Sequence, residues 1–234
     1  MVIPREVGVM ILPEVTLFPQ ALLPLFIFEP RYRRMLADSL ASHRLFAVAM
    51  LRPGSSRESP ASVGGLGLVR VAVDNPDGTA HLMLQGLTRI ELGGVVRYKP
   101  YRVHNIRPLT PVAPDGITTP ALLATIKKLV QERIQLESSP SPGQAPQASE
   151  IEEPPEVLPT GPSGFLDEKM ISYLNGIHDA DTIADLVSWS LLSRPLERQE
   201  ILETVDIEPR LRRLIHFLMA EIRQRRKNGG DERP

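Results

Sequence analysis

Residues 11 to 50 read ILPEVTLFPQALLPLFIFEPRYRRMLADSLASHRLFAVAM, and this stretch decides the fold. It opens as an apolar run broken by prolines, continues as the hydrophobic hexad from Leu22 to Ile27, and then crosses Glu29-Pro30. Pro30 suits the first turn of a helix, and the apolar side chains after it recur with helical spacing. One face of this helix collects Tyr32, Met35, Leu36, Ser39 and Leu40. The stretch is therefore predicted to run from a strand into an amphipathic helix, and from there into a second buried strand.

Strand patterns dominate the sequence as far as about Leu109. The AsnProAspGly sequence at 75 to 78 predicts a hairpin, and Gly93-Gly94 predicts a further turn. Many strands at short spacing favour a compact antiparallel barrel or sandwich, with the helix after Pro30 covering one opening. Besides the hexad, the predicted strands are Val7 to Leu12, Leu45 to Leu51, Gly64 to Val73, Thr79 to Leu92 and Val95 to Ile106, the last interrupted by Pro100.

Helical patterns replace the strands after Leu109. Thr119 and Pro120 fit the N-cap and first position of a helix that ends near Leu136. Residues 138 to 164 are rich in Ser, Pro, Gly, Gln, Ala and Glu, so they are predicted to be a disordered or extended insert. Four further helices are predicted, at Phe165 to Ile177, Asp179 to Leu192, Pro195 to Thr204 and Ile207 to about Arg226.

The sequence thus predicts an α+β protein with two lobes. Residues 1–112 form a β lobe with one helix, residues 113–228 form a helical bundle that contains the insert at about 138–164, and residues 229–234 form a disordered tail. A chain of 234 residues, 42% hydrophobic and 24% charged, can bury such cores. No apolar run approaches the roughly 18 residues of a membrane span. The chain has no cysteine and no recognisable export signal, so a cytoplasmic location is expected.

The sequence contains no motif of an ordinary enzyme. No glycine is followed by lysine, so a Walker A phosphate loop is absent, and neither HExxH nor GxSxG occurs. The histidines are scattered without metal-ligand spacing, and no lysine lies in a setting that suits a Ser-Lys dyad. We therefore expect no catalytic activity, no cofactor and no metal site.

Aromatic and basic residues are the candidates for a protein-binding surface. They are Phe26, Phe28, Arg31 and Tyr32 around Glu29-Pro30, and Arg89, Tyr98 and Tyr101 from the later strands. A structural interpretation competes with this one, because apolar residues in strands are most often packed. Under it, Phe26 and Phe28 alternate into the core and the tyrosines are half-buried. Trp189, on or beside the apolar face of its helix, is predicted to lie in the core or at the lobe interface.

The order of these segments resembles the amino-terminal, substrate-binding domain of Lon proteases. LPEVTLFPQALLPLFIFEPRYRRML is similar to the opening of that domain, and LFAVAML, VGGLGLVRV and NPDGTAHLMLQGLTRIEL follow in the family's order, with Tyr101 before the closing strand. HDADTIADLVSWSLLSRPLERQEILETVDIEPRLRRLIHFLMAEI is similar to the family's helical lobe. The resemblance covers nearly the whole chain except the insert. It implies a PUA-like pseudo-barrel followed by an all-α lobe.

The resemblance also implies a function, which is to bind unfolded or degron-bearing polypeptides. In Lon proteases an ATPase module and a Ser-Lys peptidase module follow this domain, whereas this sequence ends at Pro234. We therefore expect a stand-alone, non-catalytic recognition module with no membrane partner, serving as adaptor or accessory subunit of a separate ATP-dependent protease, or acting with a chaperone. The family offers no catalytic residue to carry over.

Two alternatives stay open. PUA-like barrels also occur in RNA-modifying proteins, and arginine supplies most of the basic residues, which favours an RNA-binding module. A net charge of −1 and a pI of about 6.5 argue against nucleic acid as the partner. The other alternative is a hydrolase whose motif is not recognisable in the sequence.

Overall fold

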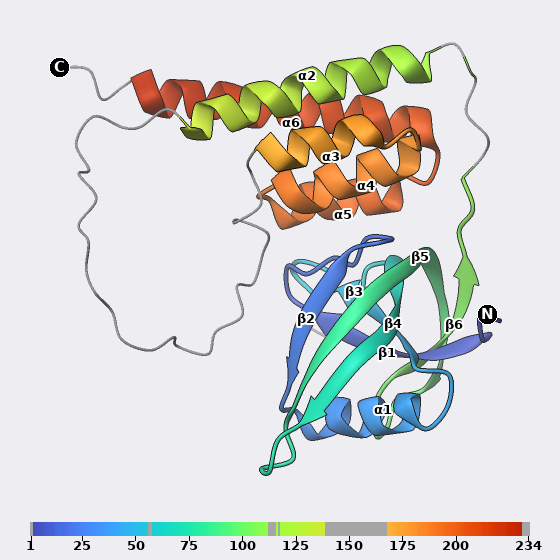
Figure 1. Ribbon diagram of the computed structural model, residues 1–234. Helices are drawn as coiled ribbons and strands as arrows, with labels where there is room; N and C mark the ends of the chain where they lie inside the picture. Colours follow the sequence, from blue (N-terminus) through green and yellow to red (C-terminus); the bar gives the residue numbers. More distant parts are fainter. Residues whose placement is uncertain (1, 56–57, 112–115, 117, 139–167, 231–234) are drawn as a thin grey trace, which may run out of the picture.

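The computed structural model describes residues 2–55, 58–111, 116, 118–138 and 168–230. A β lobe is followed by a helical lobe that lies against one end of it (Figure 1). The β lobe contains β1 (Glu6–Leu12), β2 (Leu22–Ile27), α1 (Pro30–Leu40), β3 (Leu45–Met50), β4 (Val63–Asp74), β5 (Ala80–Arg97) and β6 (Val103–Pro108). The helical lobe contains α2 (Thr119–Ser138), α3 (Glu168–Gly176), α4 (Ala180–Leu191), α5 (Pro195–Glu203) and α6 (Ile207–Gly230). The predicted α+β class is confirmed.

The described strands form one six-stranded sheet in the order β2-β5-β4-β3-β1-β6, and β6 also pairs with β5, which closes most of the sheet into a barrel. Every described pair is antiparallel except β1 with β3, which run parallel from Val9 opposite Ala47 to Leu12 opposite Met50. The prediction of an antiparallel barrel needs this one correction. A parallel pair requires a long crossover. Residues 13 to 44, which hold β2 and α1, provide it, and this is why the opening stretch decides the fold.

The turn predicted at Gly93-Gly94 is wrong. β5 continues through both glycines to Arg97, and the chain reverses between Tyr98 and Arg102 instead. The pairing of β5 with β6 shifts register between Leu92 and Val95, so the glycines lie in a β-bulge. Paired glycines occur both in β-bulges and in turns, so the sequence alone does not distinguish the two. The pairing of the strand with its neighbour does. The hairpin at 75 to 78 is confirmed, with Gly78 at a φ of 79°.

Helix α1 lies across the end of the barrel that is farther from the helical lobe (Figure 1). Its buried residues are Tyr32, Met35, Leu36 and Ser39, on the face that the spacing predicted. The Tyr32 hydroxyl donates to the carbonyl of Ile11 at 3.2 Å and accepts from the Ile11 N–H at 3.1 Å. The helix therefore closes the barrel and is tied directly to β1.

The helical lobe agrees closely with the predicted helices. The Asp179 carboxylate caps α4 by accepting from the Thr182 N–H at 2.7 Å. α6 continues to Gly230, beyond the predicted end near Arg226 and into the first residues of the predicted tail. Residues 139 to 164 of the predicted insert and 231 to 234 of the predicted tail lie outside the described residues. β6 ends at Pro108 and α2 begins at Thr119, on either side of the boundary predicted at 112.

The lobes share their interior through the loop between β1 and β2. Leu17 and Phe18 are adjacent and both fully buried, but Leu17 packs in the β lobe and Phe18 packs in the helical lobe. The loop lies directly on β5, because a Cβ added to Gly86 would come within 1.9 Å of the Phe18 carbonyl oxygen. Glycine is therefore required at this close approach. One short loop thus belongs to both cores.

Candidate functional site

The outward side of β2, β5 and β4 carries a continuous apolar surface, which we call the outer apolar face. The inward side chains of the same strands, among them Leu23, Leu82 and Val69, pack with α1 in the inner core. Side chains alternate across a strand, so the residues between them point to solvent. The outer apolar face consists of Leu22, Pro24, Phe26 and Phe28 on and after β2, His81 and Met83 on β5, and Val71 and Val73 on β4.

The strand register arranges these residues in rows. Phe26 is opposite His81, and His81 is opposite Val73 on its other side. Pro24, Met83 and Val71 make the next row in the same way. The rings of Phe26 and His81 are 4.8 Å apart, and those of Phe26 and Phe28 are 5.9 Å apart. Directly opposite side chains in neighbouring strands contact one another, so the rows form one surface.

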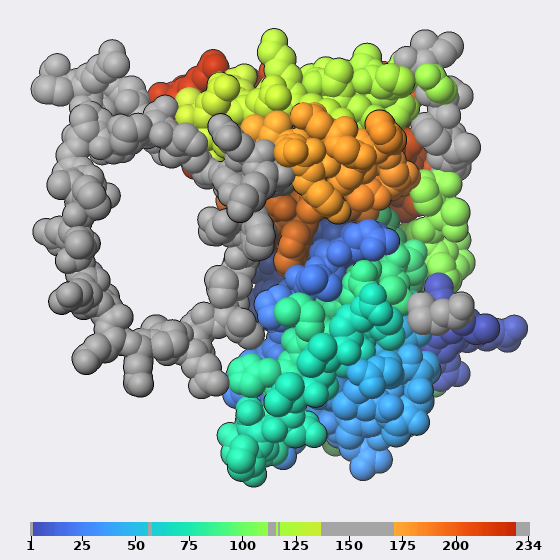
Figure 2. All heavy atoms as spheres, in the orientation of Figure 1, coloured from blue at the N-terminus to red at the C-terminus, as the bar shows by residue number. Residues whose placement is uncertain are grey.

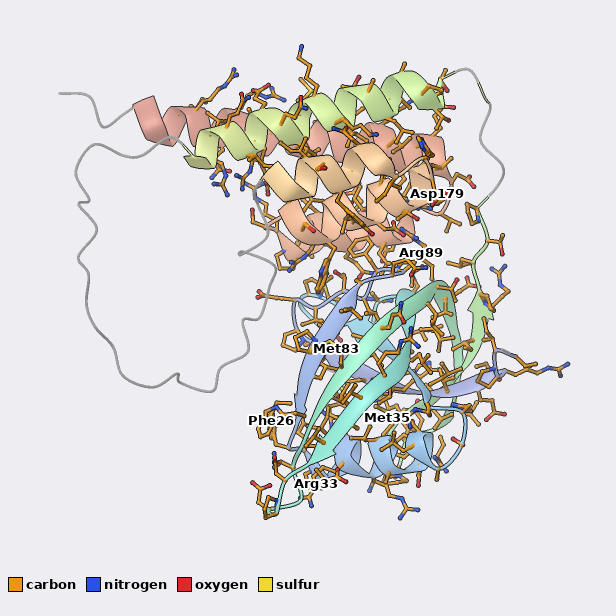
Figure 3. All side chains as sticks on the ribbon, viewed as in Figure 1. Phe26, Arg33, Met35, Met83, Arg89 and Asp179 are labelled. Atoms are coloured by element: carbon orange, nitrogen blue, oxygen red, sulfur yellow. The ribbon has the colours of Figure 1, made fainter. Side chains whose placement is uncertain are left out.

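This surface is open to solvent. Phe26 is 49% exposed, Phe28 59%, and both Val71 and Val73 56%. Figure 2 shows this side, with β2 in blue and β4 and β5 in teal to green below the orange helices, and Figure 3 labels Phe26 and Met83 on it. His81 is the one ionisable side chain in the set. Monomeric proteins rarely expose a contiguous apolar patch of more than a few hundred Å², and such patches mark interaction sites.

The structure places the rings of Phe26 and Phe28 outside the core. Neither ring alternates into the core, so the structural interpretation is wrong for this pair. The hexad LLPLFI is apolar at every position, and its own pattern therefore does not tell which face is inside. Pairing with β5 settles the matter, because Leu23 and Ile27 are buried on the inner side.

Four other predicted site residues lie around α1 and the turn between β5 and β6. Tyr32 and Tyr101 are buried, so they are not part of an accessible surface. The Tyr101 hydroxyl donates to Asp38 at 2.8 Å, and this hydrogen bond holds the pKa of the Asp38 carboxyl below its usual value. Arg31 is half-exposed, and Tyr98 is the most exposed of the four, beneath the Arg102 guanidinium.

Arg31 is occupied by carboxylates. Its guanidinium donates to Glu58 at 2.7 Å and to Glu29 at 2.8 Å. The hydrogen bond from Arg31 lowers the pKa of Glu58, and the same bond raises the pKa of Arg31. These groups form a small set of ion pairs that joins α1 to the loop before β4. The predicted residues around Phe26 therefore form an apolar surface, whereas Arg31 belongs to a set of ion pairs.

The remaining predicted site residue, Arg89, is 4% exposed and lies at the junction between the lobes (Figure 3). Its guanidinium makes a bidentate ion pair with Asp185 of α4, with Nη1 to Oδ2 at 2.8 Å, and its Nε donates to the Leu202 carbonyl at 3.1 Å. Arg89 therefore joins β5 to two helices. Its prediction as a binding-surface residue is wrong, because its side chain is enclosed by the two lobes.

Asp185 also faces a second arginine. Arg210 of α6 is fully buried and lies 3.4 Å from Asp185 and 2.7 Å from Asp181. Its Nε donates to the Thr204 carbonyl at 2.7 Å. Burial lowers the pKa of Arg210, and the nearby charge of Arg89 acts in the same direction. We call Arg89, Asp185, Arg210 and Asp181 the junction network. Trp189 packs against both the helical core and the inner β core, which agrees with its predicted place at the lobe interface.

The described residues contain no other arrangement that suggests chemistry. No group of three or more His, Asp or Glu among them is placed to hold a metal ion. None of the described helices has the length and apolar character to cross a membrane. The arrangement is suited to contact with apolar surface.

Comparisons with known proteins identify the family of the chain. The model of the substrate-binding domain of the ATP-dependent protease La (LON) matches residues 6–220. The chain belongs to the Lon substrate-binding domain family. The Lon protease of Dictyoglomus thermophilum is 24% identical over 223 residues, covering 94% of this chain and 25% of that protein. The Lon protease of Desulfosudis oleivorans is 23% identical over 227 residues, covering 94% of this chain and 24% of that protein.

Solved structures show the same fold. The amino-terminal domain of the Mycobacterium avium complex Lon protease matches with a TM-score of 0.67 at 18% identity, over 92% of this chain and 98% of that one. The Lon N-terminal domain protein from Xanthomonas campestris matches with a TM-score of 0.60 at 17% identity, over 91% and 98% of the two chains. The family match is to a substrate-recognition module, and that part of a Lon protease is not itself catalytic.

Sequence reasoning missed part of the outer apolar face. Val71, Val73 and Met83 lie within predicted strands and are not among the predicted surface residues, although they complete the surface around Phe26. A signal was present in VRVAVD, where the positions at 71 and 73 alternate with Ala72. Because apolar residues occupy both faces of this strand, the alternation alone did not reveal an exposed apolar side.

Proposed function

We propose that the protein captures unfolded or degron-bearing polypeptides on the outer apolar face and delivers them to an ATP-dependent protease or a chaperone. The observation that carries this proposal is the exposure of Phe26, Phe28, Val71 and Val73 on the outward side of one sheet. Exposed apolar segments distinguish unfolded chains from folded ones. An apolar surface on a rigid support therefore selects for the unfolded state.

The family membership supports the same proposal. The matched domain is described as substrate-binding, and the curated relatives are ATP-dependent proteases of which this chain spans 25% or less in the two cases above. Handing substrates to a protease is therefore part of the proposal. The absence of cysteine from the chain is compatible with the predicted cytoplasmic location.

The test is binding of reduced, carboxymethylated lactalbumin, a permanently unfolded model protein, measured by fluorescence anisotropy. The variant carries Phe26→Ser together with Val73→Ser. We expect binding to weaken at least about ten-fold, because hot-spot aromatic and aliphatic contacts dominate such interfaces. The thermal midpoint is expected to change little, because both side chains are half-exposed or more.

The matched control is Leu196→Ser on α5. Leu196 is 58% exposed, as much as Val73, but it lies in the helical lobe, outside the outer apolar face. The control variant should bind the unfolded protein as the wild type does. Equal losses in both variants would mean that general surface hydrophobicity, and not this face, is responsible. No binding by the wild type would contradict the proposal.

RNA binding has less support from the structure. Several basic side chains of the β lobe are paired with carboxylates, including Arg31 with Glu58, Arg34 with Asp38 and Arg107 with Glu91. Phosphate binding depends on cations that are free to replace counterions. A gel shift with structured RNA at 50 and 200 mM salt tests this alternative, because phosphate binding must weaken steeply between them.

A further inference from the structure

Strand β2 has a free edge. It stands at the end of the strand order and pairs with β5 alone, whereas the other described strands have neighbours on both sides once β6 has paired with β5. Within the part of the chain that the structure describes, no hydrogen bond reaches the far side of residues 22 to 27. An unpaired edge presents N–H and C=O groups to any extended chain that approaches it.

The hydrogen bonds between β2 and β5 show which backbone groups of β2 point away from β5. The Gly86 N–H donates to the Ala21 carbonyl at 2.9 Å, just before the strand begins. Hydrogen-bonded and non-hydrogen-bonded pairs alternate along antiparallel strands. Leu23, Leu25 and Ile27 therefore bond to β5, and Leu22, Pro24 and Phe26 direct their backbone groups outward. Pro24 fits this phase, because proline has no N–H and is tolerated where that side faces solvent.

The edge has little of the protection that edge strands usually carry. Charged side chains commonly block such edges, but no charged residue occurs between Glu14 and Glu29. Pro24 is the one blocking feature within the strand. The residues whose backbone groups point outward, Leu22, Pro24 and Phe26, also contribute side chains to the outer apolar face. The free edge and the apolar face therefore adjoin along the same strand.

We propose that an extended polypeptide segment adds to β2 as a further strand, with its alternate apolar side chains beside the outer apolar face. This inference rests on the proposed capture of unfolded chains and specifies how they are held. Main-chain hydrogen bonds give affinity without dependence on sequence, and the apolar face selects segments with alternate apolar residues. A recognition module for many different unfolded chains needs this combination.

Pro24 favours a foreign segment over a second copy of this chain. Two β2 strands related by a two-fold axis at their centre would place Pro24 near Pro24, and both would lack a donor there. Moving the axis to Leu23 or Leu25 pairs Pro24 with Leu22 or Phe26 in two places, and each of those places still lacks one donor. An extended segment that lacks proline loses one hydrogen bond at Pro24 and keeps the others.

The test uses a capped nine-residue peptide of alternating valine and threonine with lysine at both ends, and two versions of it that are N-methylated at alternate amides. In a strand, successive N–H groups point to opposite edges, and in an antiparallel peptide the valine side fixes which edge faces β2. We expect one methylated peptide to bind like the parent and the other about ten-fold or more weaker, as lost hydrogen bonds predict.

These outcomes separate the inference from the proposed function. If the parent peptide and unfolded lactalbumin both fail to bind, the proposed function fails. If the parent binds and both methylated peptides bind equally well, capture occurs without strand addition, and the inference is overturned. If the wild-type protein forms dimers by sedimentation that the peptide does not dissociate, the occupant is a second copy, which also overturns it.

Two variants of the protein test the edge from its own side. Pro24→Val adds an outward N–H and keeps an apolar side chain, so the peptide should bind about five-fold tighter. Leu22→Pro removes an outward N–H, and the peptide should bind about five-fold weaker, whereas the matched control Leu22→Val should bind as the wild type does. Circular dichroism establishes that each variant is folded. An unchanged affinity in Pro24→Val and in a folded Leu22→Pro contradicts the proposal.

Discussion

The junction between the lobes and the outer apolar face each include a phenylalanine from one short stretch of chain, yet they are opposite in character. At the junction, Phe18 is fully buried and Arg89 and Asp185 are enclosed as a bidentate ion pair. On the outer face, only ten residues further along, Phe28 is 59% exposed and no ion pair is present among the face residues that the structure describes. Burial of charge fixes how the lobes are placed, and exposure of apolar side chains leaves a surface available to a partner.

The buried junction holds the two lobes together as one scaffold, and the outer apolar face is the surface that this scaffold presents. Phe18 of the β1–β2 loop packs in the helical core, and Trp189 of α4 packs against the inner β core, so unfolding either lobe exposes a side chain of the other. We therefore expect the lobes to unfold together. Trp189 is the one tryptophan of the chain and packs against both cores, so its fluorescence reports the junction directly.

The largest effect is expected from Asp185→Asn. This change removes the carboxylate between Arg89 and Arg210 and leaves two buried guanidiniums without their shared anion. Breaking a buried ion pair in this way costs about 4 kcal/mol of the free energy of unfolding. Urea unfolding followed by the fluorescence of Trp189 measures it.

Asp181→Asn is the matched control for the junction. Asp181 pairs with the same Arg210, but its side chain is 36% exposed, so a loss of about 1 kcal/mol or less is expected. Equal losses in the two variants would show that burial does not set the strength of the junction network. The proposed contrast between strong buried ion pairs at the junction and weak exposed ones at the surface would then be wrong.

A smaller effect is expected from Phe18→Ala, about 3 kcal/mol, because the change leaves a cavity in the helical core. Phe28→Ala removes the same side chain from an exposed position, and its effect should stay within about 0.5 kcal/mol. Unfolding is followed by circular dichroism and by Trp189 fluorescence. If the two signals change at different urea concentrations in the wild type, the lobes unfold separately, and the shared loop does not couple them.

Most of the fold could be predicted from the sequence, because local patterns determine it. Pro30 with the spacing from Tyr32 to Ser39 gave α1, and Asn75 to Gly78 gave the hairpin. The parallel pairing of β1 with β3 could not be predicted in this way. It depends on contacts between strands separated by a crossover, and no local pattern distinguishes a parallel strand from an antiparallel one when both faces are buried.

The candidate site was less predictable for the same reason. Phe26 and Phe28 were named, but their exposure depends on the phase that β5 imposes on an apolar hexad. Arg89 in GLTRIEL has the pattern of a polar residue on an exposed strand face, and its partner Asp185 lies 96 residues away. Long-range pairing therefore decided which predicted residues are buried and which are accessible.

The smallest effect concerns Arg31 and Glu58, an ion pair with the same chemistry as Arg89 and Asp185 but open to solvent. The hydrogen bond from Arg31 lowers the pKa of Glu58 below that of an unfolded glutamate. A lowered pKa means that the pair stabilises the protein above about pH 4.3, and that this contribution is lost as the pH falls through the folded pKa. Glu58→Gln should therefore cost less than about 1 kcal/mol at pH 7 and nothing once the carboxyl is protonated in both states.

Urea unfolding of the wild type and Glu58→Gln between pH 7 and pH 3 measures this difference. Glu91→Gln is the control, because the Glu91 pair with Arg107 is more exposed than the Glu58 pair and should contribute less. The two stability curves of wild type and Glu58→Gln should converge toward low pH. A Glu58→Gln cost near that of Asp185→Asn, or one that grows as the pH falls, would mean that solvent exposure does not separate the two ion pairs.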